Sequence, residues 1–471
     1  MSIFLKYNYF MNILEEFDTI AAVSTPLGMG GVGVIRISGE KAFEIIGKIF
    51  TNPKFEPRKF NHGRIVDNGK VIDEVIVLPF FAPNSYTGEN VIEIQCHGGV
   101  NVVKNILNLV LSNGARMAEK GEFTKRAFLN KRMDLSQAES VADIIHSKTS
   151  EFAKVSMKNL SGVLKNKINE IRNSIFEVLS RITAGIDFPE DVKEPEYDYL
   201  TESFKNIISD IDTVLSDAKS SNILRQGITV AIAGKPNVGK SSLFNALLNL
   251  DRAIVTDIAG TTRDVLRETL DLGIPVTLVD TAGIREEGEN KVEEIGIEYS
   301  KQSLNDADLV LFIYDAEQGI SEEDKKILSL IKDKNYIMAA NKADLIKNPT
   351  PKSEISTLPQ GAGSNIDITN CLKISALTGE GINELKQALT SKVCEVEPEN
   401  LEFVTNSRQQ VCLERAKAAL EQALTASEIR ELQDLISIDV KSAILALDEL
   451  TGELITDDIL DNIFEHFCIG K

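Results

Sequence analysis

The chain has no long apolar runs, no paired cysteines and no excess of basic residues. No run reaches the roughly 18 apolar residues that a membrane-spanning helix needs, so no membrane span is expected. The five cysteines are scattered, form no CxxC pair and argue against both a disulfide framework and a zinc site. The N-terminal MSIFLKYNYF lacks the apolar core of a signal peptide, and the true start is either Met1 or Met11. We therefore expect a protein of the reducing cytoplasm.

The net charge of −20 limits how this chain can bind RNA. Proteins that bind nucleic acid without sequence preference are usually basic. Any contact with RNA must therefore be made by a local basic patch, which a partner protein can share. The hydrophobic content of 43% and the charged content of 26% are ordinary for a globular protein.

The hydrophobic pattern changes along the chain. Residues 18–120 mix short strand-like runs with helical patterns at 40–49 and 101–112, which indicates a small α/β domain. From about residue 131 the pattern is helical, and the acidic, proline-containing segment 187–198 indicates a loop. Between 228 and 375 five strand-like runs alternate with helical segments, which is typical of a mainly parallel sheet flanked by helices. After about residue 393 the chain is helical again.

A phosphate-binding loop follows the first of these five runs. Residues 234–241 read GKPNVGKS and match G-x-x-x-x-G-K-[ST] between a strand and a helical pattern, which is the context that the motif requires. Its glycines let backbone N–H groups surround phosphates, and the helix N-terminus adds a positive dipole. Lys240 is expected to reach the β- and γ-phosphates, and the Ser241 hydroxyl to bind Mg²⁺.

Three later motifs, in the order of a GTPase, complete the nucleotide site. DTAG at 280–283 can hold Mg²⁺ through water and sense the γ-phosphate, and NKAD at 341–344 ends another strand. Asp344 can accept hydrogen bonds from N1–H and the 2-amino group of guanine, a pair of donors that adenine lacks. Residues 375–377 (SAL) fit the loop that contacts the base carbonyl. The sequence therefore predicts a GTPase rather than an ATPase.

The segment between the phosphate loop and DTAG is the expected first switch, and Thr262 is its candidate to close over Mg²⁺. Ras-like enzymes place a water-orienting glutamine just after the DxxG turn, but this chain has Ile284 there. Another polar group must orient the water. Spacing alone leaves five candidates open: Glu286, Glu287, Glu289, Glu293 and Glu294.

With these motifs in place, the whole chain resembles the MnmE/TrmE family of tRNA-modification GTPases. The most specific pieces of the resemblance lie outside the GTPase motifs, at residues 30–39, 86–89, 97–99, 121–124, 126–130 and 467–471. The resemblance implies an α/β plus α fold: an N-terminal folate-binding and dimerisation domain (1–130), a helical domain in two parts (131–222 and 391–471) and an inserted Ras-like G domain (223–390).

The resemblance also implies the activity and the partners. Members hydrolyse GTP with Mg²⁺ and K⁺, and they act with an FAD-dependent partner protein on C5 of the wobble uridine of certain tRNAs. They add an aminomethyl or carboxymethylaminomethyl group using a reduced, formyl-type tetrahydrofolate. They form homodimers, and a heterotetramer with the FAD-dependent protein is expected.

Site residues follow from the motifs and from the resemblance together. Glu293 matches the family's catalytic glutamate, although one extra residue between Gly283 and Val292 keeps Glu294 open, and Cys468 is the second catalytic candidate. The expected folate-binding residues are Arg36, Glu93, Arg132 (where the family more often has lysine) and Lys471. The expected metal ligands are Ser241 and Thr262 for Mg²⁺ and Asn237, Thr256, Ile258 and Thr261 for K⁺. The expected GTP-binding residues are Asn237, Val238, Gly239, Lys240, Ser241, Ser242, Thr256, Asp257, Ile258, Ala259, Gly260, Thr261, Thr262, Asp280, Thr281, Ala282, Gly283, Asn341, Lys342, Ala343, Asp344, Ser375, Ala376 and Leu377.

Simpler interpretations compete at several of these positions. The GxGxxG at 28–33 is followed by a strand-like run and not by a helix, so it is not read as a dinucleotide site. Without the resemblance, Arg36 would be assigned to a surface salt bridge, His97 to a structural turn and Cys468 to an ordinary thiol. A ribosome-assembly GTPase or a nucleotide-switched scaffold are the alternative functions, but the acidic composition and the N-terminal motifs disfavour them.

Overall fold

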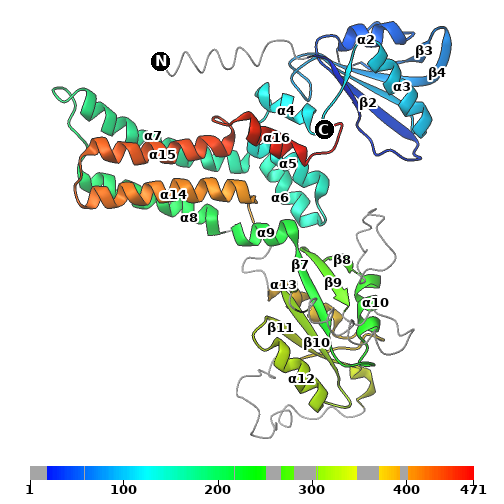
Figure 1. Ribbon diagram of the computed structural model, residues 1–471, viewed down its shortest axis with the longest axis vertical. Helices are drawn as coiled ribbons and strands as arrows, with labels where there is room; N and C mark the ends of the chain where they lie inside the picture. The colour runs from blue at the N-terminus through cyan, green and yellow to red at the C-terminus, as the bar shows by residue number, and fades with distance from the viewer. Residues whose placement is uncertain are drawn as a thin grey trace. The chain divides into compact units, whose positions relative to one another are not determined.

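The structure is a computed structural model that describes residues 18–57, 59–216, 218–250, 267–280, 304, 306–346, 371–392 and 401–471 (Figure 1). The chain forms two compact units, which are described separately. The first runs to Ala142 and includes Ile444–Lys471, and the second is Asp143–Ala443. None of the helices formed by the described residues is long and apolar enough to cross a membrane.

A six-stranded sheet forms the centre of the first unit, in the order β3-β4-β5-β2-β1-β6. Neighbouring strands are antiparallel except β1 and β6, which are parallel. The strands are β1 (Ile20–Val23), β2 (Val32–Ser38), β3 (Asn61–Asp67), β4 (Lys70–Phe80), β5 (Val91–His97) and β6 (Arg116–Met117). The run at 34–37 is therefore a strand, as predicted, and the preceding glycine-rich segment is not followed by a helix.

Side chains alternate between the two faces of this sheet, as the period of a strand requires. One face packs against α2 (Ala42–Ile49) and α3 (Val100–Ser112), whose apolar stripes build a core with Ile35, Ile37, Ile92 and Ile94. These helices match the patterns expected at 40–49 and 101–112. The alternate residues of the same strands, Arg36 and Glu93, point away from this core, so the sequence period places polar groups on the opposite face.

Near β1 the opposite face is covered by α4 (Glu122–Leu129). Phe123 of this helix packs on Ile20 and Ala22, with Tyr86 beside them. The C-terminal α16 (Asp457–Glu465) packs on α4, and a β-bridge joins Ile469 to Lys120. Two segments more than 300 residues apart in the sequence are thus side by side.

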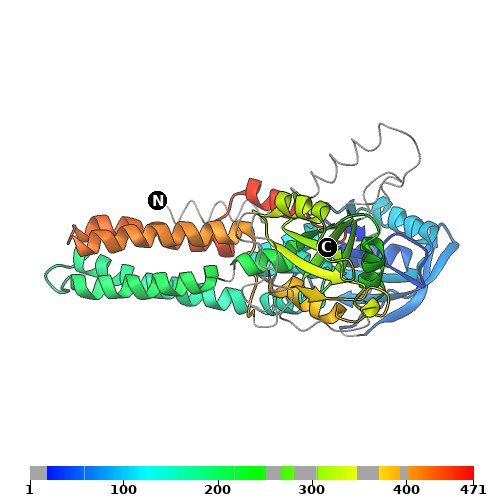
Figure 2. The same cartoon turned by 90° about the horizontal axis from the view of Figure 1, so that it is seen from below.

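The second unit combines long helices with a second sheet. Its helices outside the sheet region include α6 (Ser150–Leu160), α7 (Val163–Asp187), α8 (Tyr197–Ser216), α9 (Ala218–Gln226) and α14 (Ser407–Glu428), while α5 (Leu135–His146) and α15 (Gln433–Thr451) are divided between the units. Helices α7, α8, α14 and α15 lie side by side in both views (Figures 1 and 2). Lys417 of α14 pairs with Asp212 of α8 at 2.6 Å, although the whole sheet region separates them in sequence.

The sheet of the second unit has the order β12-β11-β10-β7-β9-β8 and is parallel except for β8. Its strands are β7 (Ile228–Ala233), β8 (Arg267–Asp271), β9 (Pro275–Asp280), β10 (Leu309–Asp315), β11 (Tyr336–Asn341) and β12 (Leu372–Lys373). The accompanying helices are α10 (Lys240–Leu250), α12 (Glu322–Ile331), α13 (Ile382–Ser391) and the 3-10 turn η1 (Ala343–Leu345).

The α/β plus α fold class predicted from the sequence is confirmed. All five strand-like runs are strands of one sheet, although β12 ends at Lys373 and not at Ser375. The antiparallel strand β8 was not predicted, because its sequence RETLD contains three charged residues and little apolar pattern. The predicted limits of the four domain segments stay a prediction.

Candidate functional site

The phosphate loop leaves the carboxyl end of β7 and enters α10, and its backbone conformation explains its glycines. Gly234 and Gly239 have φ of +153° and +95°, and Asn237 also has a positive φ of +64°. A Cβ on Gly234 would collide with the carbonyl of Ile313, and one on Gly239 with the amide of Asn341. The Lys240 ammonium donates to the carbonyls of Gly234 at 2.8 Å and Lys235 at 3.0 Å, so it is held over the loop.

Asn341, at the end of β11, connects two loops of this site. Its side-chain amide donates to the carbonyl of Val238 in the phosphate loop at 2.8 Å. Its side-chain oxygen accepts the backbone N–H of Ala376 at 3.0 Å. Because Asn341 is 2% exposed, both bonds lie in a protected environment where each is worth more than in water. One residue thereby fixes the phosphate loop relative to the SAL loop.

Asp344 and Lys342 are oriented by separate partners. The Ser375 hydroxyl donates to one carboxylate oxygen of Asp344 at 2.6 Å. The Lys342 ammonium lies 2.7 Å from Asp315 at the end of β10, and the Lys342 backbone has a φ of +67°. Burial raises the pKa of Asp315, but Lys342 and the N–H groups of Glu317 and Gln318 outweigh it, so the pKa of Asp315 lies below its usual value. The carboxylate of Asp315 therefore stays charged and holds Lys342 in place.

A second cluster of predicted site residues lies on the polar face of the first sheet. The Arg36 guanidinium pairs with Glu93 on the neighbouring strand at 2.8 Å, where the two side chains are 12% and 20% exposed. The same guanidinium lies 5.1 Å from the centre of the Tyr86 ring and 5.5 Å from that of Phe123. A cation at these distances from aromatic rings is stabilised by their negative faces. Arg36 thus forms the salt bridge that the simpler interpretation expected, but the pair is largely buried and not at the surface.

The C-terminal segment completes this second cluster. The Gly470 carbonyl accepts hydrogen bonds from Arg36 and from the Ser24 hydroxyl, both at 3.3 Å. The Lys471 ammonium lies 5.9 Å from the centre of the Tyr86 ring. Burial, and then the neighbouring charge of Arg36, lower the pKa of Lys471, while Glu93 and Cys468 act in the opposite direction. Two cations thus lie near one aromatic ring, with Glu93 paired to one of them, which suits a ligand that carries both a ring and negative charge.

Two family models match the chain. The model described as "GTP-binding protein TrmE N-terminus" matches residues 19–132, and the model described as "MnmE helical domain" matches residues 135–468. A protein of Clostridioides difficile (strain 630) named "tRNA modification GTPase MnmE" is 45% identical over 464 residues, covering 96% of this chain and 99% of that protein.

The chain belongs to the MnmE family.

Further relatives agree with this assignment. A protein of the same name from Thermotoga petrophila is 43% identical and covers 96% of this chain and 100% of its own length. Among solved structures, Era of Aquifex aeolicus bound to GDP.AlF4- is 30% identical, covering 41% of this chain and 66% of that one, with a TM-score of 0.28. The G domain of the FeoB iron transporter of T. maritima is 26% identical, covering 36% and 99%, with a TM-score of 0.25. These TM-scores are low, so the assignment rests on the family models and the full-length relatives.

Family membership confirms the predicted resemblance and the prediction of a GTP-hydrolysing enzyme. The structure brings together the phosphate loop, Asn341 and the SAL loop, and it brings together Arg36, Glu93 and Lys471. Arg132 is exposed and packs beside Gly88, where its Cγ lies 3.3 Å from an ideal Cβ built on that glycine. Cys468 is exposed near Lys471. The predicted site residues outside the described residues are Thr256, Asp257, Ile258, Ala259, Gly260, Thr261, Thr262, Thr281, Ala282, Gly283 and Glu293.

Tyr86 lies beside the predicted folate-binding residues but was not itself predicted from the sequence. Tyr86 begins the Tyr86–Glu89 motif of the family, but no role was assigned to it. Its hydroxyl shares a hydrogen bond of 2.8 Å with Thr124, and its ring faces both Arg36 and Lys471. Because these three residues come from separate parts of the sequence, only the fold reveals the contact.

Proposed function

We propose that this chain is a K⁺-dependent GTPase that acts with an FAD-dependent partner on C5 of the wobble uridine of certain tRNAs, to which it adds an aminomethyl or carboxymethylaminomethyl group. Full-length relatives at 43–45% identity named tRNA modification GTPases support the reaction class. The orientation of Asp344 by Ser375 beside the anchored Asn341 is the structural observation that carries the choice of a guanine nucleotide.

The phosphate loop fits a Mg²⁺-bound triphosphate. Gly234 and Gly239 allow the loop to adopt its conformation, because both have a positive φ and a Cβ at either position would collide with Ile313 or Asn341. Ser241, in the first turn of α10, and Thr262 would hold Mg²⁺, which neutralises charge on the phosphates. Lys240 would bind the β- and γ-phosphates, and the N–H groups at the start of α10 would stabilise their charge.

Without a glutamine after the DxxG turn, water must be oriented in another way. Glu293 is proposed to orient the attacking water, with Glu294 as the alternative, and a K⁺ ion is proposed to supply positive charge near the β- and γ-phosphates. Asn237 would be one K⁺ ligand: it is exposed on the phosphate loop, where its φ is positive. Thr256, Ile258 and Thr261 would provide the others.

A reduced, formyl-type tetrahydrofolate is proposed to bind at Arg36, Glu93, Arg132 and Lys471. The aromatic ring of Tyr86 with two cations beside it fits a ligand with a heterocycle and carboxylates. When bound, such a folate supplies a one-carbon unit. Arg36 and Lys471 would bind its negative groups, and Glu93 would accept from its N–H groups. Cys468, exposed on the same C-terminal segment, is proposed as a second catalytic residue. Homodimer formation is proposed as well.

The reaction class is tested by mass-spectrometric nucleoside analysis of tRNA from cells that lack the protein. C5-modified wobble uridine should disappear and should return on expression of the wild-type chain. Asp344→Asn and Cys468→Ser should fail to restore it if the nucleotide and the thiol take part. An unchanged nucleoside profile in the deletion strain would exclude the proposed reaction.

A further inference from the structure

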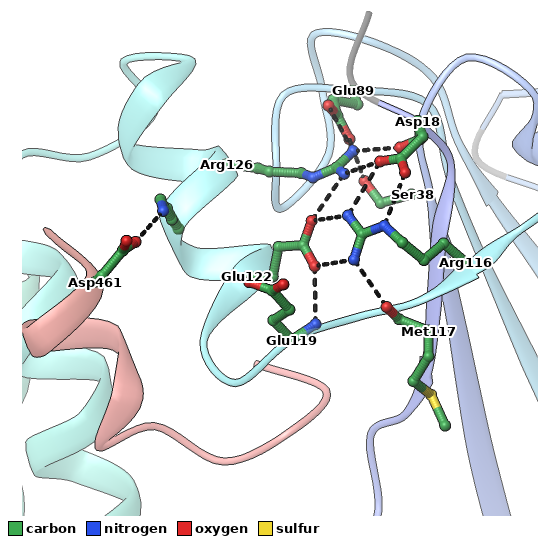
Figure 3. A network of polar contacts seen from close by, with 10 residues as sticks. Asp18, Ser38, Glu89, Arg116, Met117, Glu119, Glu122, Arg126 and Asp461 are labelled. Carbon is green, nitrogen blue, oxygen red and sulfur yellow. Dashed lines mark hydrogen bonds and ion pairs between the residues drawn. The ribbon is translucent and has the colours of Figure 1, made fainter. Parts of the chain in front are cut away.

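Five charged residues form a cluster behind the folate candidate site: Asp18, Glu89, Arg116, Glu122 and Arg126 (Figure 3). Arg126 of α4 is only 1% exposed, which is rare for an arginine. Its guanidinium lies 2.9 Å from Glu122, 3.3 Å from Glu89 and 3.3 Å from the Asp18 carboxylate, and it donates to the Asp18 carbonyl at 2.9 Å. None of these five residues is among those proposed above to bind the folate.

Arg126 and Arg116 share two carboxylate partners, but only Arg126 contacts a third, Glu89. Both arginines pair with Asp18 and with Glu122, and Arg116 does so at 2.7 Å in each case. Of the two arginines, only Arg126 contacts Glu89 in the part of the chain that the structure describes. This contact connects the cluster to the loop of residues 85–90. Figure 3 shows Glu89 above and Glu122 below the Arg126 guanidinium, with Asp18 beside it.

Glu89 ties this loop to the strand that carries Arg36. One Glu89 oxygen accepts from the Ser38 hydroxyl at 2.6 Å, and Ser38 shares a further hydrogen bond of 2.8 Å with Thr87. Ser38 lies two residues after Arg36 on β2. The carbonyl of Thr87 also accepts from the Asn130 amide at 2.7 Å. The loop is thus fixed between β2 and α4, and Tyr86 is the residue of this loop that faces Arg36 and Lys471.

A buried guanidinium is stable only while carboxylate partners neutralise its charge and accept hydrogen bonds from its N–H groups. Its planar fork can bridge two or more carboxylates at once, which the single ammonium of lysine cannot do in the same geometry. The Arg126–Glu89 contact therefore acts together with the bonds from Ser38 and Asn130 to fix the loop that carries Tyr86.

We propose that Arg126 is a positioning residue of the folate site: through Glu89 it holds the Tyr86 ring against Arg36 and Lys471. This inference rests on the proposed folate function. It predicts that replacing the Arg126 guanidinium weakens folate binding, even though Arg126 is not among the residues that would contact the ligand. It also predicts that Arg116, which shares two partners but not Glu89, matters much less.

Isothermal titration of the full chain with 5-formyltetrahydrofolate tests this inference. Arg126→Lys should weaken binding at least tenfold, and the matched control Arg116→Lys less than threefold. Glu89→Gln, which keeps a hydrogen-bond acceptor for Ser38, should weaken binding as well, and adding it to Arg126→Lys should cause little further loss because both changes break one contact. Similar losses in the Arg116 and Arg126 variants would overturn the inference, and so would wild-type binding by Arg126→Lys.

A fluorescence measurement reports the position of the loop without any ligand. The chain has no tryptophan, so Tyr86→Trp introduces a single indole at the site. Adding Arg126→Lys should increase quenching of this indole by acrylamide, whereas adding Arg116→Lys should leave it unchanged. Equal quenching in all three proteins would overturn the inference, even if Arg126→Lys proved unstable in titration. A wild-type chain that does not bind the folate would instead remove the proposed folate site, and this inference with it.

Discussion

Asp344 and Asn341 lie three residues apart and have different tasks. Both side-chain groups of Asn341 are used within the protein, on Val238 and Ala376. Asp344 has one oxygen bonded to Ser375, and its carboxylate is the group expected to accept from the guanine edge. We therefore expect recognition of the base to depend on Asp344, while Asn341 joins the loops of the site.

Asp344→Asn should exchange guanine for xanthine as the preferred base. The amide donates where the carboxylate accepted, and xanthine has a carbonyl where guanine has its 2-amino group. Loss of one charge-assisted hydrogen bond costs about 1.5–3 kcal/mol, or roughly 10- to 150-fold in GTP affinity. Competition titrations with GDP and xanthosine diphosphate measure this change. The matched control Asp308→Asn, at a carboxylate that accepts from Thr229 N–H away from the base, should keep the guanine preference. An unchanged preference in Asp344→Asn would contradict the assignment.

The contribution of the charged cluster to the stability of the fold depends on pH through Glu122. Burial raises the pKa of Glu122, but bonds from Arg116, the Glu119 N–H and Arg126 outweigh it, so its pKa lies below the ordinary value of 4.5. A carboxylate whose pKa is lowered by folding stabilises the fold above about pH 4.5, and this stability is lost as the pH falls through the lowered pKa.

We expect Glu122→Gln to lower the free energy of unfolding of the first unit by about 1.5–3 kcal/mol at pH 7, and the difference from wild type to shrink towards pH 3. Chemical unfolding at pH 7, 5 and 3 measures this effect. Glu44→Gln is the matched control, because Glu44 belongs to an exposed ion pair with Lys48 on α2 and should change stability little at any of these pH values. A constant difference between Glu122→Gln and wild type from pH 7 to 3 would contradict the charged role of Glu122.

At the scale of elements, α4 is the point where the C-terminal segment meets the first sheet. Gly121, directly before α4, has a φ of +66° and donates to the carbonyl of Cys468 at 3.4 Å. A Cβ on Gly121 would lie 2.9 Å from both Phe464 and Phe467. The absence of a side chain at Gly121 is therefore a condition for the C-terminal segment to pack here.

Gly121→Ala should displace the C-terminal segment and expose Cys468 further. Both the positive φ and the steric contact oppose an alanine, so we expect a loss of about 2–4 kcal/mol from the two effects together. The rate of Cys468 modification by a thiol reagent, followed by peptide mass mapping, should rise. Gly114→Ala is the matched control: its φ of +114° is even less favourable for alanine than +66°, but a Cβ there meets nothing within 4 Å. Equal rates in the two variants would show that contact with the phenylalanines is unimportant.

At the scale of the whole molecule, GTP hydrolysis should depend on K⁺ and on pairing of two G domains. An arginine finger supplies roughly 10³–10⁵ in rate, about 4–7 kcal/mol, and a K⁺ ion held by Asn237 would place positive charge in a similar position. We expect faster turnover in K⁺ than in Na⁺ at equal ionic strength, and a specific rate that rises with protein concentration if pairing is intermolecular. Steady-state phosphate release measures both effects, and equal rates in the two salts would exclude the cation mechanism.

Glu293→Ala should reduce this turnover while leaving GDP affinity nearly unchanged, as expected for a residue that acts in the transition state. Glu294→Ala is the matched control one position away. An inactive Glu294→Ala beside an active Glu293→Ala would move the catalytic role by one residue.

Much of the nucleotide site could be predicted from the sequence because each of its motifs is a short run of neighbouring residues. The phosphate loop, NKAD and SAL each lie at the end of a strand, and parallel strands bring their carboxyl ends to one edge of the sheet. Strands and helices with clear apolar periods were also predicted, whereas β8, with its charged sequence, was not.

The sequence by itself determined the family, the fold class and the identity of the base that is read, since each depends on residue types at fixed short spacings. Only the tertiary structure decided how Tyr86, Arg36 and Lys471 meet, and that Arg126 is buried among three carboxylates. In the sequence, nothing distinguishes Arg126 from the other charged residues of predicted helices. Its burial follows from packing of α4 between the sheet and the C-terminal segment, contacts that join residues far apart along the chain and leave no periodic pattern in it.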